Sequence, residues 1–335
     1  MKKYNKKMIL VSVFISGGLL LTACGQNETL PEAAPDAEAE NTVEEVEVEA
    51  TEEPEVKEAD IVREETAEIS HTHGLELNPS NPDSYLIATH HGVVEYEGPT
   101  QAYVLGEMRD DFMGFSRVAD TQYLMSSGHP GHGSDLPDPL GFMWSENSGQ
   151  TWEFRSLLGE YDFHALTASY QDNKHILGHA LDFKNNFESF IFRSTDQGYN
   201  WERVETNGLP LDQHAVHDMA FSPEDDKIVF AATAKGLFRS DDSGVNWSEA
   251  TAGNIKGLAV LGNNEVYYFN GSNEELYRWT GEKSETISYP TEYGAVNYIV
   301  VNEMGNLVIT TERSSLLKQE NNENWNVLID NGQVK

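Results

Sequence analysis

The sequence has a single cysteine, few basic residues and no long hydrophobic run. With one Cys in 335 residues, no intramolecular disulfide can form, and metal sites built from several cysteines are excluded. Only 22 Lys and Arg stand against 56 Asp and Glu, so the formal net charge is −34. A chain this acidic lacks the basic surface that nucleic acids and anionic membrane faces attract. We therefore expect no nucleic-acid partner.

The apolar residues are numerous enough for a folded core, at 39% of the chain with 14 Tyr, 14 Phe and 6 Trp. The longest apolar stretch, residues 8–21, follows four lysines and is shorter than the roughly 20 residues that a spanning helix needs. It ends in Leu-Thr-Ala-Cys-Gly at residues 21–25, which resembles a bacterial lipobox. The sequence thus predicts a lipoprotein signal peptide over residues 1–23, lipid attachment at Cys24 and a membrane location facing away from the cytoplasm.

Residues 24–69 are expected to form a disordered acidic tether. Between residues 26 and 69 the chain has 17 Asp and Glu, two basic residues, three prolines and no aromatic residue. Such a segment buries too little apolar surface to fold, and charge repulsion keeps it extended. The folded domain is expected to span residues 70–333.

Three segments of the folded region match one pattern, S-x-[DN]-x-G-x-[TN]-W. They begin at Ser145, Ser194 and Ser240, so the starts are 49 and 46 residues apart, a spacing that suits one four-stranded propeller blade. In a hairpin turn, the Asp or Asn accepts backbone hydrogen bonds, Gly adopts a positive φ and Trp restarts the strand and packs inward. The positions assigned to these turns are Asn147, Gly149, Trp152, Asp196, Gly198, Trp201, Asp242, Gly244 and Trp247.

These segments resemble the Asp-box, or BNR repeat, of sialidase-like and sortilin-like propellers. The resemblance implies a structural role for the boxes and extends to exported bacterial propellers described as glycosyl-hydrolase-like. Six repeats of two short β-rich runs, from residue 73 to residue 310, predict an all-β, six-bladed β-propeller, or seven blades if the ends interleave differently. Only eight Arg follow residue 70, and no arginine triad is evident, so sialidase activity is not expected.

Most histidines fall on one face of the expected propeller. His73, His164 and His217 occupy the same register at the start of the first strand in three repeats, so they should converge at the central channel. His71 and His129 lie nearby in this arrangement, as do Asp111 and Asp162, which each stand two residues before such a start.

Imidazoles with carboxylates are the ligands of zinc and copper. We therefore expect a transition-metal site of His73, His164 and His217, helped by His71, His129 and Asp162. Hydrogen-bonded polar residues that cap the channel are the alternative for these side chains. Two further functions remain open, a glycosidase that uses Asp111 and Asp162 on a glycan, and a non-catalytic scaffold that binds a protein.

Overall fold

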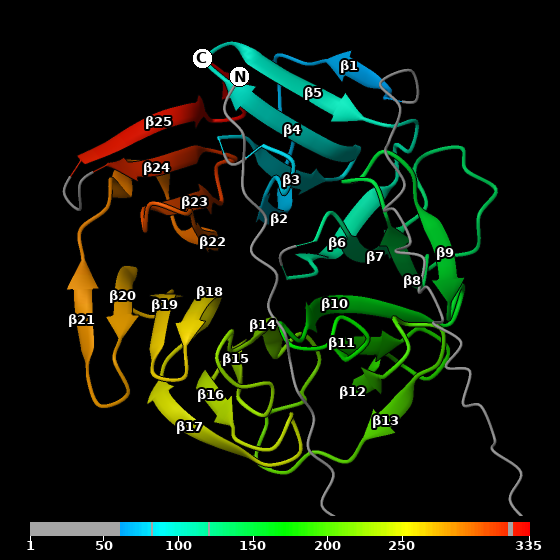
Figure 1. The fold of residues 1–335 in the computed structure, drawn as a ribbon, viewed down its shortest axis with the longest axis vertical. Helices are drawn as coiled ribbons and strands as arrows, with labels where there is room; N and C mark the ends of the chain where they lie inside the picture. The colour runs from blue at the N-terminus through cyan, green and yellow to red at the C-terminus, as the bar shows by residue number, and fades with distance from the viewer. Residues whose placement is uncertain (1–60, 82, 120, 321–323) are drawn as a thin grey trace, which may run out of the picture. The chain divides into compact units, whose positions relative to one another are not determined.

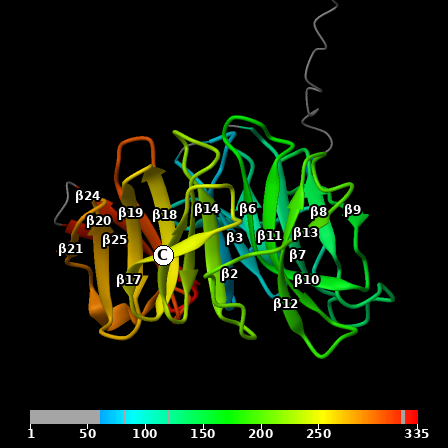
Figure 2. The same ribbon diagram turned by 90° about the horizontal axis from the view of Figure 1, so that it is seen from below.

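A computed structural model describes residues 61–81, 83–119, 121–320 and 324–335. These residues form six antiparallel sheets around a common centre, as Figure 1 shows, and Figure 2 shows the strands running between the two faces. The predicted six-bladed β-propeller is confirmed. The residues predicted to form the signal peptide, Cys24 and most of the predicted tether lie outside the described residues. In the described part of the chain, no helix is long and apolar enough to cross a bilayer.

The first three blades follow one another along the chain. Blade one contains β1 (Arg63–Glu65), β2 (Thr72–Leu77), β3 (Tyr85–Thr89), β4 (Gly92–Gly98) and β5 (Gln101–Leu105). Blade two contains β6 (Asp111–Arg117), β7 (Leu124–His129), β8 (Phe142–Ser145) and β9 (Glu153–Ser156). Blade three contains β10 (Tyr161–Ala168), β11 (Ile176–Asp182), β12 (Glu188–Ser194) and β13 (Glu202–Val204).

The other three blades complete the circle. Blade four contains β14 (Val216–Phe221), β15 (Val229–Thr233), β16 (Gly236–Ser240) and β17 (Trp247–Ala252). Blade five contains β18 (Ile255–Gly262), β19 (Glu265–Asn270), β20 (Glu275–Trp279) and β21 (Ser284–Ile287). Blade six contains β22 (Val296–Val301), β23 (Leu307–Thr311), β24 (Leu316–Glu320), β25 (Asn324–Asp330) and β26 (Gln333–Val334), and the 3-10 helix η2 (Thr291–Tyr293) precedes it.

The core lies between the blades. Each of six apolar clusters combines buried residues of two neighbouring blades, and one of them joins blade six to blade one. The second strand of a blade is therefore covered on both sides, and β3, β11 and β15 are buried along their whole length. This explains their runs of apolar and small residues without polar alternation.

The two ends of the described chain close the propeller. Ile69 donates its backbone N–H to the Gly332 carbonyl at 2.7 Å, and Val334 donates to the Ala67 carbonyl at 3.0 Å. Further upstream, β1 pairs with β5, and the Arg63 guanidinium lies 2.8 Å from the Glu95 carboxylate. Residues 63–69 thus pack on the propeller, and the predicted boundary at residue 70 is several residues too late. The acidic composition of this segment hid its backbone pairing, which needs no apolar side chains.

The three repeated turns lie where they were predicted, between the third and fourth strands of blades two, three and four. In the first, Asn147 Oδ1 accepts the Thr151 N–H at 2.9 Å and Ser145 Oγ accepts the Gly149 N–H at 2.9 Å. Gly149 has φ 88°, and the Trp152 indole N–H donates to its carbonyl at 3.2 Å. The same bonds recur in residues 194–201 and 240–247.

Only one of the three turn tryptophans is buried as predicted. Trp247 is 8% exposed, whereas Trp152 and Trp201 are half-buried. All three indoles donate to the carbonyl of the glycine in their turn. Trp247 gains cover because residues 207–209 run alongside its strand, with two backbone hydrogen bonds to residues 245 and 247. The inward packing predicted for Trp152 and Trp201 is therefore only partial.

Candidate metal centre at the channel mouth

The innermost strand of every blade has a β-bulge near its start. A bulge adds a residue to one strand and redirects its side chain. Here the side chains at or beside the bulges line one cavity of about 320 Å³ at the mouth of the channel, far more than one water molecule occupies. Each blade contributes one such side chain, and in blade order these are His73, Met113, His164, His217, Lys256 and Asn297.

The expected convergence of His73, His164 and His217 is thus only partly realised. All three border the mouth, together with His71 and His214. Among the described residues, however, the group with three metal-ligand atoms within 4.8 Å of one another is a different one. It consists of His73, His90 and Asp111. Whether the predicted residues bind a metal stays a prediction.

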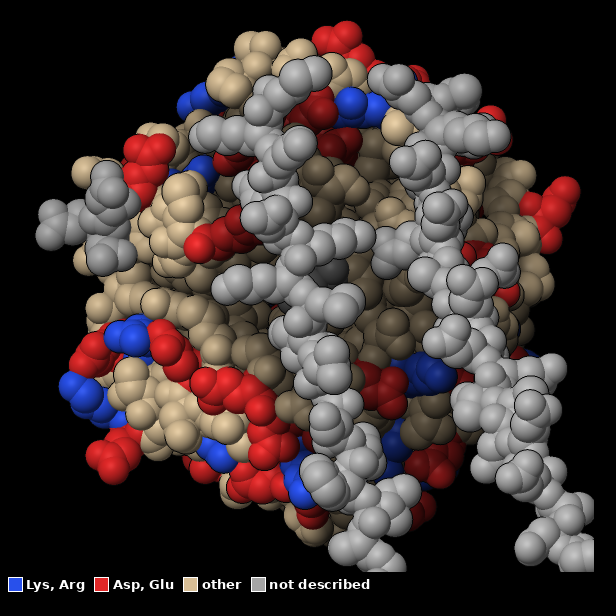
Figure 3. Space-filling model, in the orientation of Figure 1, with Lys and Arg blue, Asp and Glu red and all other residues tan. Residues whose placement is uncertain are grey.

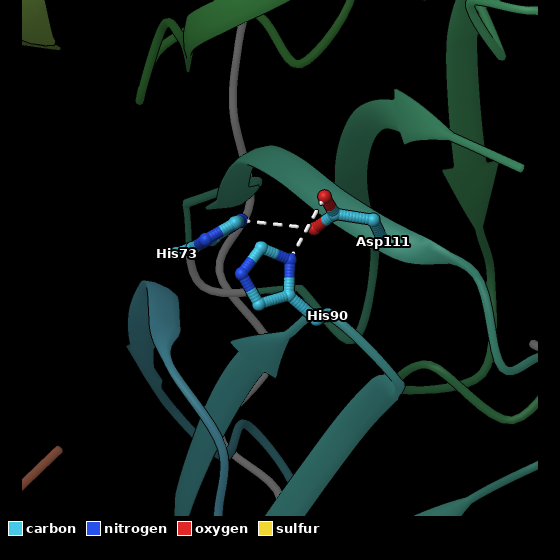
Figure 4. Close-up of side chains that lie close together, drawn as sticks. All are labelled: His73, His90 and Asp111. Atoms are coloured by element: carbon cyan, nitrogen blue, oxygen red, sulfur yellow. Dashed lines mark ion pairs between the residues drawn. The ribbon is translucent and has the colours of Figure 1, made fainter. Parts of the chain in front are cut away.

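The His73 group joins blades one and two, as Figure 4 shows. Nδ1 of His73 lies 2.9 Å from Oδ1 of Asp111, and Nδ1 of His90 lies 3.0 Å from Oδ2. His73 comes from the bulge of β2, His90 follows β3, and Asp111 begins β6. Because β2 and β3 are antiparallel, the end of β3 lies beside the start of β2, and blade two then brings in the carboxylate.

Two buried atoms of this group have only each other as partners. Nδ1 of His73 and Oδ1 of Asp111 form an ion pair at 2.9 Å that does not meet hydrogen-bond geometry, and neither has a hydrogen-bond partner among the described residues. Buried polar atoms without hydrogen bonds are costly and call for an explanation. A cation bound beside this pair would give both atoms a further partner.

The protonation of the group suits a cation. Burial alone would raise the pKa of Asp111, but the neighbouring His73 and His90 imidazoles outweigh burial and lower that pKa. Burial, and then repulsion from His73 and His90, lower the pKa of His71. Near neutral pH Asp111 is therefore ionised and the adjacent His71 is neutral, and both of these forms can bind a transition metal.

A second group surrounds Asp162, in β10 of blade three. Its carboxylate is 1% exposed, with Oδ2 at 2.7 Å from Nε2 of His164 and 3.5 Å from Nε2 of His129. Ser127 Oγ donates to Oδ1 at 3.5 Å. Burial would raise the pKa of Asp162, yet hydrogen bonds from His129 and His164 prevail and hold it well below its usual range. Both oxygens of Asp162 have side-chain partners, as those of Asp111 do, but Asp162 is almost completely buried.

His129 does not fit its predicted part as a metal ligand. Nδ1 contacts Asp138 at 2.7 Å while Nε2 faces Asp162, so both ring nitrogens are occupied. The hydrogen bond to Asp162, opposed by burial and supported by Asp138, raises the pKa of His129 to about 9. A doubly protonated imidazole has no lone pair for a metal. His129 instead links Asp138, in the loop that follows β7, to Asp162 in β10.

Burial lowers the pKa of three further histidines on this side. Nδ1 of His217 donates to the Ile255 carbonyl at 2.6 Å, which leaves Nε2 as the lone-pair nitrogen. Burial lowers the pKa of His217, and burial followed by repulsion from His164 lowers that of His214. His179 lies in the middle of β11, where it is fully buried and burial lowers its pKa to about 3.

Below the mouth, the channel wall holds two carboxylates that sequence reasoning missed. Glu76 Oε1 accepts the Arg117 N–H at 3.0 Å, and Asp218 Oδ2 accepts the Leu258 N–H at 3.3 Å. Each bond ties the inner strands of two neighbouring blades together. Burial raises the pKa of both groups, that of Asp218 to about 7. Each is the one carboxylate of a mostly apolar strand, and nothing in the sequence indicated that it accepts a backbone hydrogen bond from the neighbouring blade.

The pKa values of Asp111 and Asp162 are not those expected for the two carboxyl groups of a glycosidase. Such an enzyme needs one carboxyl group with a raised pKa to act as general acid. Both carboxyl groups instead have lowered pKa values and imidazole partners. No described observation therefore favours the glycan-cleaving alternative over ligand binding.

Charged side chains are distributed unevenly over the surface. Figure 3 shows acidic side chains gathered along the rim of one face, whereas its hollowed middle is mostly uncharged where it is visible. With 56 acidic against 22 basic residues, the field of the whole chain attracts cations.

The fold, but no family, is shared with known proteins. The sequence matches no protein-family model and no curated protein. An ancestral GH74 enzyme aligns with 79% of this chain and 39% of its own, at 13% identity and TM-score 0.52. The extracellular domain of a putative one-component system from B. thetaiotaomicron aligns with 82% of this chain and 36% of its own, at 13% identity and TM-score 0.53.

A third similar structure is a catalytically inactive virginiamycin B lyase from Staphylococcus aureus, solved with quinupristin. It aligns with 80% of this chain and 88% of its own, at 14% identity and TM-score 0.50. At these identities the likeness shows a shared β-propeller fold and no common activity. The chain also spans less than half the length of the first two proteins.

Proposed function

We propose that this protein is a metal-binding β-propeller that holds a transition-metal ion at the channel mouth with His73, His90 and Asp111. The three ligand atoms that lie within 4.8 Å of one another carry this proposal. Ligand atoms around a tetrahedral ion with bonds of about 2.0–2.1 Å lie roughly 3.3 Å apart. The observed separations of 2.9 and 3.0 Å need only a small expansion to admit the ion.

His71 is the fourth ligand of the proposed site. With bonds of about 2.0–2.1 Å, the ring centroids of two imidazoles on one tetrahedral ion lie roughly 5 Å apart. The His71 centroid is 5.1 Å from that of His73 and 5.6 Å from that of His90, whereas the His73 and His90 centroids are 4.3 Å apart and would have to separate to bind the ion. Three imidazoles and one carboxylate suit zinc or copper. Four protein ligands make a closed site, which favours metal capture over catalysis.

The location follows from the N-terminal sequence. We propose that a lipid on Cys24 anchors the chain to a membrane, outside the cytoplasm, with the propeller at the end of the acidic segment. Replacement of Cys24 by Ala is expected to release the protein from the membrane fraction or to stall its processing. A mature, membrane-bound Cys24→Ala variant would contradict the anchor while leaving the metal site untouched.

The metal site is tested by titration of tag-free, metal-free protein with zinc and with copper. Wild type should bind an ion that a His73→Ala/Asp111→Asn variant binds on the order of 100-fold more weakly, because two ligands are lost. His132→Gln is the matched control, since His132 is exposed and outside the group. Equal uptake by wild type and the double variant would refute the site.

Metal binding should also stabilise the fold, because the ligands come from two blades. An ion present at 100 times its dissociation constant adds about 2.7 kcal/mol to the free energy of unfolding. The melting temperature should therefore rise with added zinc in wild type and in His132→Gln, and should not rise through this site in the double variant.

A further inference from the structure

A second pair of imidazoles borders the mouth on the side of blades three and four. His164 lies in β10, His214 directly precedes β14, and their ring centroids are 5.3 Å apart. Both line the same cavity as His71 and His73. We propose that His164 and His214 form a second transition-metal site, in which all protein ligands are imidazoles. This site stands independently of the His73 group.

The separation of the two rings fits a shared ion. Two imidazoles on one tetrahedral ion have centroids roughly 5 Å apart, and the interplanar angle of 57° leaves the rings tilted rather than stacked. Rings tilted in this way can each direct one nitrogen toward a common ion.

The buried Asp162 prepares His164 for a metal. Nε2 of His164 lies 2.7 Å from Oδ2 of Asp162, so the ring proton faces the carboxylate and the Nδ1 lone pair remains for a ligand. Imidazoles that bind metals commonly donate their other N–H to a carboxylate, which orients the ring and makes the ligand nitrogen more basic. Ser127 and His129 hold Asp162 in turn.

His214 completes the pair from an unusual backbone position. Its φ of 57° is left-handed, a conformation that costs energy in a residue other than Gly. The side chain is exposed, so it can rotate toward His164 without repacking the core. His217 lines the same cavity with Nδ1 committed to Ile255, and its free Nε2 adds a third imidazole to this wall.

The second site should differ from the first in strength and chemistry. In the described residues, no three ligand atoms on this side lie within 4.8 Å of one another. An ion at this site would therefore bind two imidazoles, and water molecules would occupy its other coordination positions. Fewer protein ligands mean weaker binding. Neutral nitrogen ligands without a carboxylate favour copper over zinc, in line with the general affinity order of divalent metals.

The test is a copper titration of tag-free protein followed by electron paramagnetic resonance and by elemental stoichiometry. Wild type should bind two ions, the second at least tenfold more weakly and with nitrogen as its only protein ligands. A His164→Gln/His214→Ala variant should bind one ion; Gln at position 164 keeps an N–H for Asp162. His214→Ala alone, a surface change that spares the fold, should already weaken the second step about tenfold.

The outcomes separate the two sites. A single ion in wild type, or a second ion that persists in His164→Gln/His214→Ala, would overturn the second site. If instead His90→Ala/Asp111→Asn loses no ion while the His164 variant loses one, the first site fails and the second stands. His132→Gln should bind both ions, and loss of an ion in that variant would show that the exposed loop histidine is the ligand.

Discussion

Asp111 and Asp162 occupy the same position in neighbouring blades and do different things. Each stands two residues before the bulge side chain of its inner strand, Met113 in blade two and His164 in blade three. Asp111 reaches back to His73 and His90 of blade one, and one of its buried oxygens has no hydrogen bond. Asp162 is enclosed and has partners for both oxygens.

The neighbours account for this difference. His164 lies at the bulge of the same strand as Asp162, and His129 lies at the end of β7 in the neighbouring blade. Asp162 therefore has two imidazole partners close by. Blade two has Met113 at the equivalent place, which offers Asp111 no proton. Asp162 is thereby a buried brace of the fold, whereas Asp111 pairs with the more exposed histidines of blade one, where we propose that it holds a cation.

The largest expected effect is on stability. Asp162→Ala should lower the free energy of unfolding by about 3–5 kcal/mol, because it leaves the protonated His129 without its buried counter-charge. Urea unfolding of the metal-free protein measures this. A loss below about 1 kcal/mol would mean that Asp162 is no brace and that the contrast with Asp111 is false.

Asp111→Asn should show the opposite pattern. Metal binding at the His73 site should weaken on the order of 100-fold, while metal-free stability changes by less than about 1 kcal/mol because the ion pairs are partly exposed. Calorimetric titration beside urea unfolding separates the two readouts. A variant that loses stability but keeps its metal would assign Asp111 the role proposed for Asp162.

The pH dependence of stability should reveal the Asp162 brace. The pKa of His129 is about 9 in the folded protein, above its ordinary 6.5, so protonation stabilises the fold. This contribution is complete below about pH 6.5 and is lost as the pH rises through 9. Melting temperatures from pH 6 to pH 10 should fall in wild type, and less so in His129→Gln. Parallel curves would contradict the pairing.

The smallest expected effect concerns His132, which shares the 127–138 loop with His129. Its side chain is exposed, so His132→Gln should alter stability by less than about 0.5 kcal/mol and leave metal uptake unchanged. Thermal melts and a zinc titration check both. A clear loss in either would mean that the loop, and not the Asp162 brace, organises this side of the mouth.

Much of the mouth could be foreseen because the blades repeat. The common register of His73, His164 and His217 was visible in the sequence, and so was the equivalence of Asp111 and Asp162. His90 was harder to foresee as a ligand, although the antiparallel pairing of β2 and β3 was a signal that could have brought it beside His73. The full burial of the turn tryptophans was overestimated because the cover over Trp247 comes from residues 207–209, outside the repeat.

The sequence by itself determined the six blades, the turns that close them and the face on which most histidines gather. These depend on local pattern and on a repeat length that any blade must satisfy. Only the tertiary structure decided which imidazole meets which carboxylate. Asp111 finds its partners in the preceding blade and Asp162 finds His164 in its own strand, because side-chain direction at a bulge and the approach of neighbouring blades are set by closure of the whole ring.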